Sequence, residues 1–366
     1  MWFINRITKI DWQVLLFGAI LAVISCLFIF SSTHTSQQPY SIYFTKQVFG
    51  FIIGFIIYFI FCNIDFRSLS RWGYFAYFAL ILLLLFTLIK GSIGFGAQRW
   101  IDIKIFKFQP SECAKLLLPA FIVYHLQGES DTHHYTLRSF ILIFVIMAIS
   151  FVLVLKQPDL GTALIIVITG TIMLWQAGLT KKFFLWSIII VTVSAPVLYK
   201  CLKPYQRKRI EVFCGAGDRH RERYQIEQSK IAIGSGGVLG KGFLQGTQNR
   251  LAFLPERRND FIFSVICEEW GLCGATLILL LYLFLIMHLL LEINKVRNFS
   301  AQLLALGLLI PIALSIVINI GMVIGLLPVV GIELPLLSYG LTHTWITLAA
   351  LGWINGITTN KLTNRE

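Results

Sequence analysis

The chain has 366 residues, of which 57% are hydrophobic and only 13% are charged, and its mean hydropathy is +0.76. Soluble domains carry about 25% charged residues, so this composition excludes a soluble globular protein, and the 30 Phe exclude a disordered chain. The formal net charge of +13 indicates contact with anionic lipid or a phosphate-bearing substrate, and no nucleic-acid partner is expected.

Apolar runs follow one another along the chain. A membrane span needs about 20 mostly apolar residues and has to satisfy its own backbone hydrogen bonds, so each run is predicted to be a helix. The prediction is an all-α polytopic membrane protein with about ten transmembrane helices, built as a single integral membrane domain over residues 1–366. The runs lie near 13–30, 47–62, 73–89, 113–126, 139–155, 161–178, 183–199, 270–291, 302–325 and 341–357.

The orientation follows from the basic residues. Ten spans place both termini on the same side of the membrane. Lys and Arg are more frequent in the segments that share a side with the N-terminus than in the short loops opposite. Because short segments rich in Lys and Arg stay in the cytoplasm, the N- and C-termini are predicted to be cytoplasmic.

Residues 200–260, between the seventh and eighth helices, are predicted to form a large extracytoplasmic loop. The loop holds 13 Lys and Arg against six Asp and Glu. It is either a solvated basic loop or a site for a multiply charged anion such as a lipid pyrophosphate. Cys201 and Cys214 lie in this region and can pair if it is outside the cytoplasm.

A glycine-rich run at 231–242 (IAIGSGGVLGKG) stands out inside this loop. It has neither the GxxxxGK[ST] pattern of a phosphate-binding loop nor the strand context of a dinucleotide site. We interpret it as a re-entrant or surface-lying helix with a tight turn, folded against the mouth of the helix bundle.

Ionisable residues at membrane depth are costly and are functional candidates by default. Glu112 and Lys115 share one face at a helix start, where they are either functional or a structural ion pair. Asp159 and Asp260 each precede an apolar helix, where each is either an N-cap or a functional carboxylate. Of Glu268 and Glu269, one is expected to face the bundle interior and the other to be structural.

Metal and nucleophile motifs are weak in comparison. No HExxH or GxSxG pattern occurs, and the seven His make no metal set. His288, on an apolar helix, is expected to be packed or to reach toward the interface.

Eight segments in chain order resemble the SEDS family of cell-wall polymerases, whose name stands for shape, elongation, division and sporulation. The signature is specific and extends over nearly the whole chain. Within the family, residues 240–242 (GKG), 246–248 (GTQ) and 254–257 (LPER) resemble RodA, the elongation member, rather than FtsW. The segments are 96–100 (GAQRW), 108–112 (FQPSE), 157–162 (QPDLGT), 205–207 (YQR), 228–237 (QSKIAIGSGG), 254–263 (LPERRNDFIF), 319–328 (NIGMVIGLLP) and 335–340 (PLLSYG).

The resemblance implies a peptidoglycan glycosyltransferase of the bacterial inner membrane that joins lipid II units into glycan strands. Asp260 stands at the family's essential carboxylate, which implies that it is the catalytic base. No cofactor is expected, apart from a divalent cation such as Mg²⁺ or Mn²⁺ that could bridge the pyrophosphate. The resemblance also implies a class B penicillin-binding transpeptidase and other elongation-complex proteins as partners. The residues predicted to bind substrate and the undecaprenyl pyrophosphate leaving group are Arg207, Arg209, Lys230, Arg257, Arg99, Lys115, Glu112, Asp159 and Gln228.

The chain departs from the family's pattern at three places. Arg258 and Asn259 stand where the family usually has His-Thr, and residues 341–344 (LTHT) replace a Gly-Ser-Ser-like segment. Residues 213–223 lack the usual Asp-Pro-rich loop. A Leu at position 341 in place of a small residue is expected to narrow either the helix packing or a lipid groove there.

Two other functions remain open at this stage. A transporter or lipid flippase would spread polar residues along a path through the membrane. Here the notable charges cluster at the outer mouth, which favours surface chemistry. A scaffold of a wall-synthesis complex without activity of its own would tolerate loss of Asp260.

Overall fold

The computed structural model describes residues 10–34, 40–94, 97–104, 106–129, 137–180, 224–251 and 253–359, together with residues 135, 182–183, 185, 207 and 211–212. Nine long helices within these residues correspond to nine of the ten predicted spans. The seventh predicted span, 183–199, lies outside the described residues except for two of them. The helices are α2 (Trp12–Thr33), α3 (Ile42–Asn63), α4 (Phe66–Lys90), α5 (Pro110–Glu129), α6 (Leu137–Lys156), α7 (Leu160–Gln176), α12 (Ile262–Asn294), α13 (Phe299–Val323) and α14 (Leu341–Thr359).

The bundle confirms an all-α polytopic membrane protein. Six of the helices are long and apolar enough to cross a membrane, namely α2, α3, α4, α6, α12 and α13. The fourth predicted span, which is short in sequence, is α5, and it packs against α4, α7 and α13 inside the bundle. Its side chains from Leu118 to Val123 are all buried. This helix needs fewer apolar residues because protein rather than lipid surrounds it.

A small antiparallel sheet joins α4 to α5. It consists of β1 (Ser92–Gly94), β2 (Ala97–Asp102) and β3 (Lys107–Phe108) in that order. Ile101 pairs with Phe108 and Asp102 with Lys107. The strands are too short to form an apolar run, so hydropathy alone does not reveal them.

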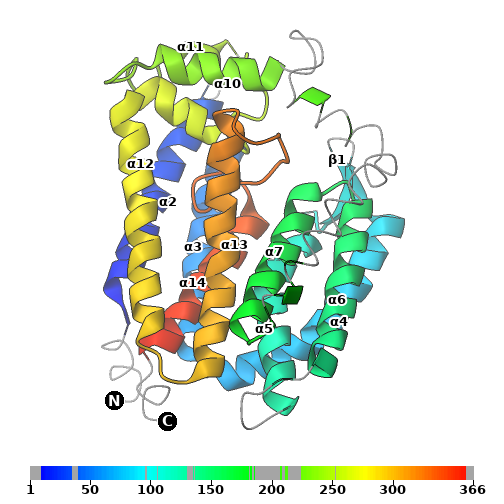
Figure 1. Cartoon of the computed structure of the whole chain (residues 1–366). Helices are drawn as coiled ribbons and strands as arrows, with labels where there is room; N and C mark the ends of the chain where they lie inside the picture. The colour runs from blue at the N-terminus through cyan, green and yellow to red at the C-terminus, as the bar shows by residue number, and fades with distance from the viewer. Residues whose placement is uncertain are drawn as a thin grey trace.

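The start of α2 and the end of α14 meet at one end of the bundle (Figure 1). The Asp11 amide donates to Asn355 Oδ1 at 3.0 Å, and Asn355 Nδ2 donates to the Asp11 carbonyl at 3.0 Å. His288 Nε2 bonds the Asp11 carboxylate at 2.5 Å, so it is a paired side chain rather than one that is merely packed or reaching outward. Both described ends of the chain therefore lie on the same side, as predicted.

The glycine-rich run lies at the opposite end, where α10 (Tyr224–Ser235) and α11 (Thr247–Arg250) cover the top of α12 in Figure 1. Helix α12 is kinked at Gly271, whose φ is +64°. The amides of Leu272 and Cys273 there donate to the Gly237 and Val238 carbonyls, at 2.9 and 3.1 Å. For the described residues this confirms a surface-lying helix and tight turn folded against the bundle.

Candidate active site

The predicted carboxylates gather at the end of the bundle that carries α10. Glu112 lies in the first turn of α5, Asp159 directly precedes α7, and Asp260 lies two residues before α12. These helices all start at this end, so residues far apart in sequence are brought to one face of the molecule.

Asp159 is an N-cap, as one of its two interpretations predicted. Its Oδ1 accepts from the Thr162 amide at 3.3 Å, and its Oδ2 accepts from Gln109 Nε2 at 2.8 Å. Arg99 Nη1 lies 3.6 Å from the same carboxylate, and the guanidinium stacks on Trp100 at 4.5 Å. Arg99 and Asp159, both predicted to bind substrate, therefore bind one another.

Glu112 and Lys115 form the predicted ion pair, with 2.7 Å between Lys115 Nζ and Glu112 Oε1. His343 joins them from α14, with its Nδ1 2.7 Å from Glu112 Oε2. Each of the three side chains is at most 8% exposed. A buried pair of this kind is strongly destabilised when one partner is removed, because the other is left as an isolated charge.

Asp260 is not an N-cap, so that alternative is wrong. The N-cap of α12 is Phe261, which makes no side-chain capping bond. Instead, Asn319 Nδ2 on α13 donates to the Asp260 main-chain carbonyl at 2.9 Å. Gly331 lies against the carboxylate, where a Cβ would be 3.5 Å from Asp260 Oδ2.

The two residues before Asp260 are held in the same way. The Tyr339 amide donates to the Arg258 carbonyl at 2.9 Å, and Ser338 Oγ donates to the Asn259 carbonyl at 2.6 Å. Three successive main-chain carbonyls are thus tied to α13 and to the segment before α14. The backbone that carries the Asp260 carboxylate is fixed on rigid elements, which is what a pre-organised catalytic group requires.

Glu333 is a site residue that the sequence analysis missed. It lies in the segment between α13 and α14, and Gly340 packs so closely on its carboxyl that a Cβ there has no room. Burial, with the Glu112 and Asp260 carboxylates nearby, raises the pKa of Glu333 well above its usual value. The available signal was a lone acid in an otherwise apolar outer segment.

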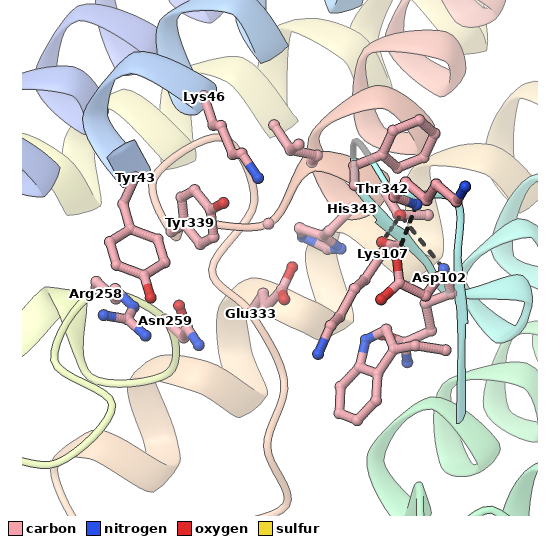
Figure 2. Close-up of a pocket in the computed structure, with 16 residues that line it drawn as sticks. Tyr43, Lys46, Asp102, Lys107, Arg258, Asn259, Glu333, Tyr339, Thr342 and His343 are labelled. Carbon is pink, nitrogen blue, oxygen red and sulfur yellow. Dashed lines mark hydrogen bonds between the residues drawn. The ribbon is translucent and has the colours of Figure 1, made fainter. Parts of the chain in front are cut away.

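A cavity of about 390 Å³ opens around Glu333 (Figure 2). It is enclosed by the start of α3, the β2–β3 hairpin, residues 258–259 and residues 333–343. None of the predicted site residues within the described part of the chain lines it. Its charged lining residues are Lys46, Asp102, Lys104, Lys107, Arg258 and Glu333.

The predicted basic residues of the loop are placed around this end but not in the cavity. Arg257 Nε donates to the Ser32 carbonyl at 2.9 Å, and burial together with the neighbouring Arg258 lowers the pKa of Arg257. Lys230, on α10, packs its side chain on Gly325. Gln228 is half-buried on α10, and Arg207 is half-buried in its own short segment. Arg209, Cys201 and Cys214 lie outside the described residues.

Glu268 and Glu269 are both structural, so the expectation that they divide between two roles is only half right. Glu268 accepts from Lys241 Nζ at 2.7 Å and from the Gln248 amide at 2.9 Å. Glu269 accepts from Ser31 Oγ at 2.5 Å and from the Leu244 amide at 3.1 Å. Together they fasten the segment after the glycine-rich turn to α12.

Comparison with known proteins decides the family. The family model of the FtsW, RodA and SpoVE proteins, described as cell cycle protein, matches residues 8–363. The chain belongs to this family. It is the SEDS family that the sequence motifs resemble.

Three relatives in this family span nearly the full chain or most of it. Peptidoglycan glycosyltransferase MrdB of Escherichia coli K12 is 36% identical over 354 residues, covering 96% of this chain and 94% of the relative. MrdB of Helicobacter pylori J99 is 37% identical over 326 residues, covering 87% and 82%. A probable peptidoglycan glycosyltransferase FtsW of Geobacter sulfurreducens is 31% identical over 366 residues, covering 97% of each. The higher identity to the MrdB relatives agrees with the predicted likeness to RodA.

Solved structures agree on the fold. A chain from a structure titled "Structural coordination of polymerization and crosslinking by a peptidoglycan synthase complex" matches with a TM-score of 0.81 at 25% identity, covering 98% of this chain and 99% of that one. Thermus thermophilus RodA matches with a TM-score of 0.72 at 24% identity and covers 98% of both chains. These similarities show the SEDS fold over 98% of this chain.

Within the SEDS fold, the residues that depart from the family's pattern meet at the cavity. Arg258, Asn259, Leu341 and His343 all line it. Leu341 packs directly on Gly50 of α3. The departures at 258–259 and 341–343 therefore meet at one place in the described part of the chain, whereas residues 213–223 lie outside it.

Among the described residues, no group of three or more His, Cys, Asp and Glu is suited to hold a metal ion. The divalent cation considered above stays a prediction, since a pyrophosphate can supply most of such an ion's ligands.

Proposed function

We propose that this SEDS protein is a peptidoglycan glycosyltransferase that polymerises lipid II into glycan strands during cell elongation. Relatives at 31–37% identity over most of the chain carry the name peptidoglycan glycosyltransferase. The observation that carries the proposal is Asp260, a carboxylate with no capping role on a backbone fixed at three successive carbonyls.

In this proposal Asp260 takes the proton from the 4-hydroxyl of the acceptor GlcNAc. The oxygen then attacks C1 of the donor MurNAc, the bond from C1 to the undecaprenyl pyrophosphate breaks, and the pyrophosphate leaves. An α-linked donor that gives a β-1,4 link is inverted, which requires one base and no covalent enzyme intermediate. Fixed cations stabilise the charge that develops on the leaving group. Arg207, Arg209, Lys230 and Arg257 remain the candidates predicted from the loop sequence.

We place the protein in the bacterial inner membrane with both termini in the cytoplasm. The hydrogen bonds between Asp11 and Asn355 support the placement of both ends of the chain on the same side of the membrane. The end that carries α10 and Asp260 then faces the outside, where a glycan strand is built.

We further propose that a class B penicillin-binding transpeptidase is a partner. Support comes from the match to a structure whose title joins polymerization and crosslinking in one peptidoglycan synthase complex. A polymerase that is bound to a crosslinking enzyme presents each new strand to that enzyme at high effective concentration. Contacts with other elongation-complex proteins remain an expectation from the family.

The test is lipid II polymerisation by the purified full-length protein, with and without its cognate transpeptidase. Wild type is compared with Asp260→Asn, which is nearly isosteric, and with Glu292→Gln, which makes the same chemical change at the opposite end of α12. Polymer is expected from wild type and from Glu292→Gln but not from Asp260→Asn. Equal polymer from all three would exclude Asp260 as the base and move the search to Asp159 and Glu112. No polymer from any of them, even with the partner, would favour the flippase or scaffold interpretation.

A further inference from the structure

The segment before α14, residues 332–338, is not helical, yet it is buried in the helix bundle. Its side chains at Ile332, Leu334 and Leu337 are at most 3% exposed. The backbone carbonyls of such a segment lose their contact with water and need donors from the protein. Side chains on α2, α12 and α13 supply such donors.

Two of these donors hold the 332–338 segment against the bundle. Ser25 Oγ on α2 donates to the Leu337 carbonyl at 2.8 Å, and the Tyr282 hydroxyl on α12 donates to the Pro335 carbonyl. Both side chains are almost completely buried. Each bond satisfies a buried carbonyl, and the stability of the fold is a sufficient explanation for it.

Asn319 on α13 does more than satisfy this segment. Its Nδ2 donates to the Ile332 carbonyl at 2.7 Å and to the Asp260 carbonyl at 2.9 Å. The side chain is completely buried, and the two N–H groups of its amide serve these two bonds. One side chain therefore links Asp260 to the segment that carries Glu333.

Ser338 makes a second link of the same kind. Its hydroxyl donates to the Asn259 carbonyl at 2.6 Å and accepts from the Leu334 amide at 2.8 Å. This side chain is also almost completely buried. The residues on both sides of Glu333 are therefore tied to the stretch that ends in Asp260.

The two links determine what lies against the Asp260 carboxylate. Gly331, which has a φ of +71°, directly precedes the linked segment, and a Cβ at this glycine would be 3.5 Å from Asp260 Oδ2. The charge of Asp260 also acts on the Glu333 carboxyl. Without the links, the backbone of Asp260 and the backbone that faces it could move separately.

We infer that Asn319 and Ser338 are positioning residues for glycosyl transfer, which fasten the backbone of Asp260 to the segment that carries Glu333 and so hold the Asp260 carboxylate in its reactive orientation. The inference rests on the proposed function and goes beyond it, because both side chains act through Asp260 rather than on the substrate. A reacting group that is misplaced by about 1 Å can lose about 10²-fold in rate. Loss of either link is therefore expected to affect the chemical step.

The first test measures kcat and KM for lipid II polymerisation by the purified full-length protein. Ser338→Ala and its matched control Ser25→Ala each delete a buried hydroxyl that donates to a main-chain carbonyl. Ser338→Ala is expected to lower kcat about tenfold and to change KM less than about twofold, whereas Ser25→Ala keeps kcat within about twofold of wild type. Equal kcat values for Ser338→Ala and wild type, or equal losses in the two variants, would overturn the inference.

The second link is tested by Asn319→Leu, with Asn249→Leu as its control. Asn249 is also a buried asparagine at this end of the bundle, and its Nδ2 donates to the Ser31 carbonyl at 3.1 Å. Asn319→Leu is expected to lower kcat about tenfold at an unchanged KM, while Asn249→Leu lowers thermal stability but not kcat. If kcat falls in both variants in proportion to the loss of thermal stability, Asn319 has only a structural role and the inference is wrong.

A double-mutant cycle tests whether the effect runs through Asp260. Asp260→Glu keeps the carboxylate but moves it by one methylene group, so the exact position of the backbone matters less. In this background Ser338→Ala is expected to lower kcat by less than about twofold, since residues that act through one another are not additive. An equal loss in both backgrounds would show that Ser338 acts by another route.

Polymer from wild type keeps the two proposals apart. If wild type makes polymer and Ser338→Ala and Asn319→Leu match its kcat, the positioning role is wrong and the proposed function stands. If wild type makes no polymer even with the transpeptidase, the proposed function is wrong, and hydrogen exchange still tests the links. The Tyr339 amide donates to the Arg258 carbonyl, and its exchange is expected to be faster in Asn319→Leu than in Asn249→Leu. Equal exchange would show that the link does not hold the two segments together.

Discussion

Asp260 and the pair Glu268–Glu269 lie close together in sequence, but their carboxylates have different roles. Glu268 and Glu269 are almost completely buried and accept hydrogen bonds from the loop that they fasten. Asp260 directly follows Asn259, which lines a cavity together with Glu333, Lys107 and Arg258. A carboxylate that is bonded to the loop it fastens stabilises the fold, whereas one that lies next to an open cavity is placed for chemistry.

The largest expected effect is on the rate of polymerisation. Asp260→Asn is expected to lower the rate by about 10²–10⁴-fold, because a positioned base contributes that much. Thermal unfolding in detergent should stay unchanged, since the variant keeps the backbone bonds of residues 258–260. A variant that is both inactive and destabilised would place Asp260 in the same structural class as Glu268.

The matching change in the structural pair should affect stability. Glu268→Ala is expected to cost about 3–5 kcal/mol of unfolding free energy, because it leaves the Lys241 ammonium and the Gln248 amide without their acceptor. Chemical denaturation measures this, with Glu292→Ala at the exposed end of α12 as the control. If both alanine variants unfold at the same denaturant concentration, the contrast between the two carboxylate regions disappears.

The kink between them offers a smaller effect. Gly271→Ala is expected to cost about 1–3 kcal/mol, because Gly271 has a φ of +64° and its missing Cβ would collide with the Gly240 amide. Gly128→Ala, on the last turn of α5 with open space around it, is the control. If Gly271→Ala unfolds at the same denaturant concentration as wild type, the glycine-rich turn shifts to make room for the added Cβ.

A further effect is on the pH dependence of stability. Because the pKa of Glu333 is raised in the folded protein, its contribution to stability is complete below the unfolded value of about 4.3 and is lost as the pH rises. Glu333→Gln, which stays neutral, should therefore gain stability relative to wild type as the pH increases from about 5 to 9. Thermal unfolding across this range measures the difference, and parallel curves for the two proteins would show that Glu333 is not buried as an acid.

Local sequence patterns predict the bundle because each span carries its own apolar run. They also predict the Glu112–Lys115 pair, since three residues on a helix set that contact. They do not predict Glu333, whose environment depends on Glu112 and Asp260, far away in sequence. They leave the role of Asp260 open for the same reason, because the bond from Asn319 that replaces capping comes from another helix.

The kink at Gly271 gives this molecule a built-in reporter. The Leu272 and Cys273 amides bond to the glycine-rich turn instead of to the preceding turn of α12. Their hydrogen exchange is therefore controlled by detachment of the turn, whereas the amides deeper in α12 exchange only when the helix itself opens. Hydrogen exchange at these two neighbouring sets of amides therefore reports separately on detachment of the glycine-rich turn and on opening of helix α12.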